Sequence, residues 1–351
     1  MKVKYVAKML MVVLVISTLS GCGSTAKDTM VQTETSEETN DTTEATEEAK
    51  EDAELTEEEI AAKEAEEAAA KEAEEAAAKE ARANEYYEAG RVSLYGLDGT
   101  DVNLETAYNN FEKAKELGKN DANFYLGVLR YWYNYPERNF EMAKTYFEEC
   151  GDNPYAQISL GFLYFSGAGV DEDREKAKEL FQTAIDNGCM DGYLGDALVA
   201  YEEEQYDIGF EYYNKVVEEG KEQLYIAYAM YWIGGMYDCG EGVEQDYAQA
   251  LDWYEKAIEM GHNPYAMNNL GAMYYYGNGV EQDYEKALEW YEKGADLGES
   301  SAMNSLGAMY YYGNGVEQDY EKALECFEKA ADLGVEEAAE NAEYLRQLLA
   351  Q

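Results

Sequence analysis

Histidine and proline are almost absent from this sequence. The 351-residue chain contains three prolines and one histidine, His262, which precedes Asn263 and Pro264. Such residues are typical of a turn, so we expect His262 to lie in solvent between two helices. Without a second histidine, no Ser–His or Cys–His pair and no histidine-rich metal site can form elsewhere. We therefore predict no catalytic residues, no metal site and no cofactor.

Basic residues are also scarce. The chain has 27 lysines and arginines against 74 aspartates and glutamates, for a formal net charge of −47, of which residues 84–351 carry −35. A surface this acidic repels phosphate backbones and anionic headgroups, which argues against nucleic acid as a partner. A basic or neutral partner suits this negatively charged surface better than an acidic one does. The alternative is that the charge only keeps an aromatic surface soluble.

The N-terminal apolar run, Met9–Ile16, is too short to span a bilayer as a stable helix. It follows three lysines and precedes the sequence LSGC that ends at Cys22. This pattern predicts a signal peptide over residues 1–21. Its end resembles the lipobox of bacterial lipoproteins, which implies lipidation of Cys22 and a location in the bacterial cell envelope, on the extracytoplasmic face of a membrane. An ordinary signal peptide is the alternative.

The other four cysteines show no close pairing. Cys150, Cys189, Cys239 and Cys326 follow no metal or redox motif. Export would permit disulfides, but this spacing favours free thiols.

Two segments without large apolar residues follow the signal peptide. Residues 22–55 are rich in Thr, Ser, Glu and Asp, and we expect a disordered acidic tether. Residues 56–85 are rich in Ala, Glu and Lys, with no stripe wider than alanine, which predicts a single solvated helix as a spacer. This helix is predicted to run from 57 to about 95.

One stretch occurs twice without a change. LGAMYYYGNGVEQDYEKALE stands at 270–289 and at 306–325. Alignment on it gives about seven helix-turn-helix units over residues 86–335, and residues 336–351 form an amphipathic capping helix. Each hairpin exposes an apolar flank that only the next can cover, so we predict an all-α, α/α solenoid.

Within one unit, glycines and an aspartate mark the helix ends. Gly277 and Gly279 are predicted to turn the chain at positive φ, and Asp283 to cap the second helix. Gly271 lets the neighbouring helix approach. The glycines follow a helix and no Lys-Ser/Thr pair comes after them, which argues against a phosphate loop.

This pattern resembles the Sel1-like repeat (SLR) family, relatives of the tetratricopeptide repeat. The carrying motif is A-x3-LG-x2-Y-x2-G-x-GV-x2-D-x3-A-x2-WY-x-KA-x3-G, which residues 266–298 match with Gly294 in place of an alanine. The resemblance implies an adaptor that binds proteins on a concave face built by the first helices. We expect this adaptor to be a monomer and, without a catalytic constellation, no enzyme. Some cysteine-rich relatives are reported to bind penicillin or hydrolyse β-lactams, which leaves a cell-wall hydrolase or β-lactamase as an alternative. The one candidate Ser-x-x-Lys, Ser24 to Lys27, lies in the tether without a pocket.

Candidate binding residues follow i, i+4, i+7 on the first helix of each unit. They include Asn268 with Tyr275 and Asn304 with Tyr311, and, further up the chain, Tyr231, Phe165 and Tyr131. An aromatic groove without positive charge would suit a basic or amphipathic peptide, or a cell-wall glycan stacking on tyrosine. Two alternatives stay open: these aromatics belong to the core, or the protein is only a structural spacer.

Overall fold

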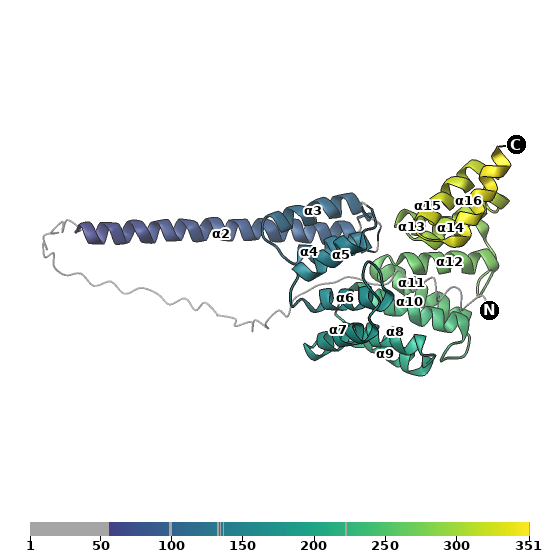
Figure 1. Ribbon diagram of the computed structural model, residues 1–351, viewed down its shortest axis with the longest axis horizontal. Coiled ribbons are helices and arrows are strands. Elements are labelled where there is room, and N and C mark those ends of the chain that lie inside the picture. Colours follow the sequence, from purple (N-terminus) through teal and green to yellow (C-terminus); the bar gives the residue numbers. More distant parts are fainter. Residues whose placement is uncertain are drawn as a thin grey trace, which may run out of the picture. The chain divides into compact units, whose positions relative to one another are not determined.

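Every regular element that the structure describes is a helix, which confirms the all-α prediction (Figure 1). The computed structural model describes residues 56–97, 100–131, 133, 135, 137–221 and 223–350. The predicted signal peptide, Cys22 and the tether lie outside these residues. Within the described part, no helix is both long and apolar enough to cross a membrane.

Fifteen α-helices and one short 3-10 helix follow one another through the described residues. Their bounds are α2 Glu57–Tyr95, α3 Leu104–Glu116, α4 Ala122–Tyr131, α5 Phe140–Glu149, α6 Pro154–Ser166, α7 Arg174–Asp186, η2 Met190–Gly192, α8 Tyr193–Glu202, α9 Tyr206–Glu219, α10 Gln223–Cys239, α11 Tyr247–Gly261, α12 Pro264–Tyr276, α13 Tyr284–Asp296, α14 Ser300–Tyr312, α15 Tyr320–Asp332 and α16 Glu336–Leu349.

The chain divides into two compact units, with the boundary inside α2 between Ala81 and Arg82. In the described part of the first unit the side chains from Ile60 to Ala81 are exposed. Lys71 Nζ lies 3.8 Å from a Glu75 carboxylate oxygen, and both side chains are more than 70% exposed. Such a pair adds at most about 0.5 kcal/mol, so this stretch has the solvated character that its composition predicts.

The second unit is a stack of helical hairpins. Consecutive helices pair as α4 with α5, α6 with α7, α8 with α9, α10 with α11, α12 with α13 and α14 with α15. The end of α2 pairs with α3, where the rings of Tyr87 and Phe111 meet edge to face. These are the seven predicted units, and α16 then packs on α15 through Ala338, Ala342 and Leu345. The solenoid prediction is confirmed.

The hairpin α12–α13 shows how the sequence sets these elements. Gly277 ends α12 at φ 74°, and the carboxylate of Asp283 accepts a hydrogen bond from the Lys286 backbone N–H at 3.0 Å, which starts α13. A Cβ on Gly271 would lie 2.7 Å from the Tyr291 ring, so only glycine allows the two helices this close. The predicted roles of all three residues are confirmed.

The second glycine of each Gly-x-Gly turn also joins one hairpin to the one before it. A Cβ on Gly279 would lie 2.6 Å from the side chain of Tyr247, and one on Gly315 would lie 2.7 Å from the backbone oxygen of Tyr284. Tyr247 and Tyr284 both begin the second helix of the preceding hairpin. The glycine pair is therefore a turn, as predicted, and a contact between hairpins in addition.

Aromatic rings fill the space between hairpins. Tyr155 on α6 stacks on Tyr225 on α10 with ring centroids 5.7 Å apart, and the Tyr225 hydroxyl donates to the Tyr155 backbone oxygen at 3.2 Å. Tyr228 and Tyr231 both contact Tyr265 on α12. Tyrosines from three different hairpins thus share one core.

This packing corrects part of the predicted binding face. Tyr131, Phe165 and Tyr231 are only 1%, 5% and 3% exposed, so the prediction that they line an open groove is wrong. Tyr131 packs against the ring of Phe140, the Arg174 guanidinium covers Phe165 at 4.2 Å, and Tyr231 lies among other tyrosines. All three rings therefore belong to the hydrophobic core.

Candidate binding site

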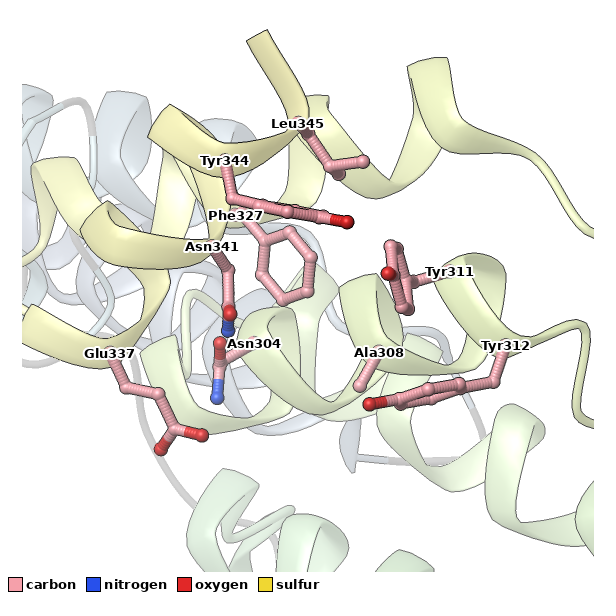
Figure 2. A pocket seen from close by; sticks show the side chains of 9 residues that line it. All are labelled: Asn304, Ala308, Tyr311, Tyr312, Phe327, Glu337, Asn341, Tyr344 and Leu345. Carbon is pink, nitrogen blue, oxygen red and sulfur yellow. The ribbon is translucent and has the colours of Figure 1, made fainter. Parts of the chain in front are cut away.

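A cavity of about 320 Å³ lies among α14, α15 and α16, at the end of the repeat stack (Figure 2). Its volume lies at the lower end of the range for ligand pockets. The lining consists of three tyrosines, two asparagines, one glutamate and three apolar side chains: Tyr311, Tyr312, Tyr344, Asn304, Asn341, Glu337, Ala308, Phe327 and Leu345.

Helical spacing brings these side chains together. Asn304, Ala308 and Tyr311 follow i, i+4, i+7 on α14, so one face of that helix forms one wall of the cavity. The buried Phe327 ring, from α15, closes the floor of the cavity. The ring fits there because Gly307 has no side chain: a Cβ on Gly307 would lie 2.8 Å from it. The opposite wall comes from α16.

Polar atoms in the cavity are only partly satisfied. The Asn304 side-chain oxygen is buried and has no hydrogen-bond partner, and Figure 2 shows it on the side facing the amide of Asn341. The rings of Tyr311 and Tyr344 meet edge to face with centroids 6.4 Å apart. A hydrogen bond with Tyr344 raises the pKa of the Tyr311 hydroxyl. Tyr312 is 64% exposed at the rim.

The cavity carries negative charge only. Glu337 is its one charged side chain, and no lysine, arginine or histidine lines it. The single basic residue of α16, Arg346, forms an ion pair with Glu328 at 2.7 Å. Basic side chains in the repeats are similarly engaged: twelve of the thirteen lysines from 113 to 329 lie in an ion pair or over an aromatic ring. The field that a ligand meets is therefore acidic.

The same face of the preceding repeat contacts the next hairpin. Ser305 Oγ donates to Asn268 Oδ1 at 3.4 Å, and Asn314 Nδ2 donates to the Tyr275 hydroxyl at 2.8 Å. Both donors come from the next hairpin. Of the four remaining predicted binding residues, Asn268 and Tyr275 thus contact another repeat, whereas Asn304 and Tyr311 share a cavity.

Sequence reasoning missed the contribution of α16. The 36-residue repeat offset places Asn341 where the preceding unit has Ser305, and Tyr344 where it has Ala308. The sequence prediction assigns α16 only as a terminal cap, although this helix aligns with the first helices of the repeats. That alignment is the signal that could have identified Asn341 and Tyr344.

The single histidine also lies beside a cavity, of about 480 Å³, formed by the end of α2 with α10 and α11. His262 ends α11 in the left-handed conformation at φ 49° and is half-buried, so the prediction that it lies in solvent is only partly right. Lys256 and Glu259 line the same cavity. Burial lowers the pKa of His262, and its Nδ1 has no hydrogen-bond partner.

The four described cysteines are all unpaired. Burial raises the pKa of each thiol, to about 12 for Cys150 and Cys239 and to about 11 for Cys326, with Cys189 raised further. These thiols stay protonated near neutral pH, which makes them weak nucleophiles. No group of three or more His, Cys, Asp or Glu side chains among the described residues is arranged to hold a metal ion.

Comparison with known families identifies the repeated hairpin. The Sel1 repeat matches six segments of this chain, which together make up more than half of it: 86–119, 120–149, 154–189, 227–262, 264–299 and 300–335. The chain belongs to the Sel1 repeat family. The matched segments leave out residues 190–226, where α8 and α9 form a hairpin without the glycine turn. Sel1 repeat proteins are generally scaffolds for protein–protein interaction.

Solved structures similar to this chain include other Sel1 repeat proteins. One from Oxalobacter formigenes is 27% identical over 60% of this chain and 83% of its own, with a TM-score of 0.42. A protective antigen of uropathogenic Escherichia coli with an SLR fold is 25% identical over 77% and 66%, with a TM-score of 0.32. Cysteine-rich protein B of Helicobacter pylori is 27% identical over 36% and 92%, with a TM-score of 0.29.

Proposed function

We infer that this protein is a lipid-anchored scaffold of the bacterial cell envelope that binds another protein through its Sel1 repeats and catalyses no reaction. The observation that carries this proposal is the stack of seven hairpins with an open cavity at its end, in a family of scaffolds. The lipobox-like sequence at Cys22 supports the anchor, and the acidic tether and solvated helix set the distance of the repeats from the membrane.

The chemistry of the described residues supports a role without catalysis. The single histidine lies at the C-terminus of a helix, and burial raises the pKa of the thiols, which therefore stay protonated near neutral pH. We therefore expect the purified protein neither to hydrolyse nitrocefin nor to release muropeptides from cell walls. Turnover in either assay would overturn this part of the proposal.

The anchor is tested with Cys22→Ser in the full chain. The parent protein should sediment with membranes, and the variant should not, because the lipid chains need the cysteine. If both proteins fractionate identically, the anchor is wrong.

Binding is tested by site-specific photo-crosslinking in living cells. A photoreactive side chain replaces Tyr312 or Ile208, which are 64% and 42% exposed on the repeats, or Lys71 on the solvated part of α2. The repeat positions should yield the same reproducible protein adduct, whereas Lys71 serves as the control and should not. Absence of any adduct from the repeats would refute the scaffold function.

A further inference from the structure

We propose that the cavity among α14, α15 and α16 receives a basic side chain, above all arginine, from the partner protein. The proposal rests on the scaffold function and adds the chemistry by which the partner is recognised. It stands on an internal comparison, on the aromatic lining and on charge.

The internal comparison comes from the duplicated stretch. In the first copy, the polar atoms of Asn268 and Tyr275 accept hydrogen bonds from Ser305 and Asn314, so this face binds hydrogen-bond donors. The second copy presents the same side chains, Asn304 and Tyr311, to the cavity. Here the Asn304 oxygen is buried without a partner. An N–H donor on the occupant would satisfy this oxygen once the Asn304 side chain turned it toward the cavity, as Ser305 of the next hairpin satisfies Asn268.

The lining distinguishes among possible donors. Three tyrosine rings border the cavity, and a planar guanidinium stacks on such faces while its edge donates several hydrogen bonds. Glu337 provides a carboxylate for a charge-assisted hydrogen bond. The cavity therefore offers an arginine both aromatic faces to stack on and a carboxylate to bind.

Charge favours a cation over a neutral occupant. The lining holds a carboxylate and no basic group, and Arg346 is turned to its partner Glu328. An acidic or phosphorylated segment would meet only like charge here. A cell-wall glycan could also stack on the tyrosines, but a neutral glycan would not be attracted by the negative charge of Glu337. The experiment below separates binding of a basic side chain from binding of a glycan.

The test uses the full chain and an array of 12-residue peptides with a central arginine and randomised flanks. The best binder is labelled with fluorescein and its Kd is measured by anisotropy. It is then resynthesised with citrulline, which keeps the shape of arginine without its charge. We expect citrulline to weaken binding about tenfold or more, the usual effect of losing a charge-assisted hydrogen bond.

Matched variants locate the binding site. Tyr312 and Tyr276 stand at the same position of the two identical copies and are 64% and 67% exposed, but only Tyr312 lines the cavity. Tyr312→Ala and Glu337→Gln should each weaken binding, and Tyr276→Ala should leave the Kd unchanged. Equal binding of the arginine and citrulline peptides, equal effects of the two tyrosine variants, or no binder on the array would each overturn the proposal.

A parallel arm measures binding of chitin oligosaccharides. Binding that Tyr312→Ala abolishes, while Glu337→Gln and added salt leave it unchanged, would replace the basic side chain with a glycan. The scaffold function is judged separately: a reproducible crosslink from the repeats, together with a negative peptide test, would refute the arginine site and leave the scaffold standing.

Discussion

The amide of Asn314 donates a hydrogen bond to the hydroxyl of Tyr275 at 2.8 Å, across the boundary between two repeats. Asn314 stands between the two glycines of its turn, and Glu241, which accepts a hydrogen bond from Tyr201, stands at the same position two turns earlier. In these two Gly-x-Gly turns the central residue therefore reaches back to the preceding hairpin. This contact gives the turn a role in stacking as well as in chain reversal.

Asn314→Ala should lower the free energy of unfolding by about 1 kcal/mol, the usual net value of one hydrogen bond. Asn278→Ala is the matched control. Asn278 has the same neighbours in sequence as Asn314, but the hairpin before it has Asp238 at the position that corresponds to Tyr275. Urea denaturation monitored by circular dichroism measures both. In a double-mutant cycle of Asn314→Ala with Tyr275→Phe, most of the stability lost in Asn314→Ala should appear as coupling free energy between the two residues. If the two substitutions have additive effects, the hydrogen bond does not contribute to stability.

Gly315→Ala should destabilise the stack by about 2 kcal/mol or more. Its φ is 75°, which strains any residue with a Cβ, and that Cβ would in addition lie 2.7 Å from the Tyr284 backbone oxygen. Gly334→Ala separates the two causes, since Gly334 has a φ of 95° with nothing within 4 Å of the added atom. That variant should lose only about 1 kcal/mol in the same denaturation experiment. Equal losses would show that the contact between hairpins adds nothing.

Local features of this fold could be predicted because they depend on neighbours in sequence. Asp283 and Asp319 cap their helices through backbone N–H groups two or three residues ahead, and Gly277 ends its helix through its own φ. Such rules apply within one hairpin whatever surrounds it. The hairpins that carry the Gly-x-Gly turn and the aspartate cap follow from these rules, whereas α8 and α9 have no side-chain cap.

The accessibility of the aromatic positions could not be predicted in the same way. Spacing at i, i+4, i+7 places Tyr231 and Tyr311 on equivalent faces, but it does not tell what lies across from each. Tyr231 meets Tyr265 from another hairpin and is buried, whereas Tyr311 meets α16 and borders a cavity. The occupant of that space is set by residues more than 30 positions away, which periodicity within one helix does not report.

Tyr231→Ala should therefore cost about 3–5 kcal/mol, as truncation of a buried aromatic residue does. Tyr312→Ala, at a residue 64% exposed, should change the free energy of unfolding by less than about 0.5 kcal/mol. Thermal melts followed by circular dichroism compare the two variants with the parent. A mild effect of Tyr231→Ala would mean that this face is open after all and would restore the predicted groove.

His262 should make stability depend on pH in a defined direction. Burial lowers its pKa from the ordinary value of 6.5, so the unfolded chain binds the proton more readily than the folded chain. The contribution of the neutral imidazole is complete above about pH 6.5 and is lost as the pH falls toward the folded pKa. His262→Asn removes this proton, and asparagine tolerates the left-handed backbone at φ 49°.

The measured quantity is the difference in free energy of unfolding between the parent and His262→Asn from pH 8 to pH 5. Buried carboxyls with raised pKa values, such as Asp238 and Glu299, titrate in both proteins and cancel in the difference. Lys256 and Glu259, which line the same cavity, are also common to both. As the pH falls, the free energy of unfolding of the parent should decrease relative to that of His262→Asn. A difference that stays constant or grows would show that His262 is not desolvated in the folded chain.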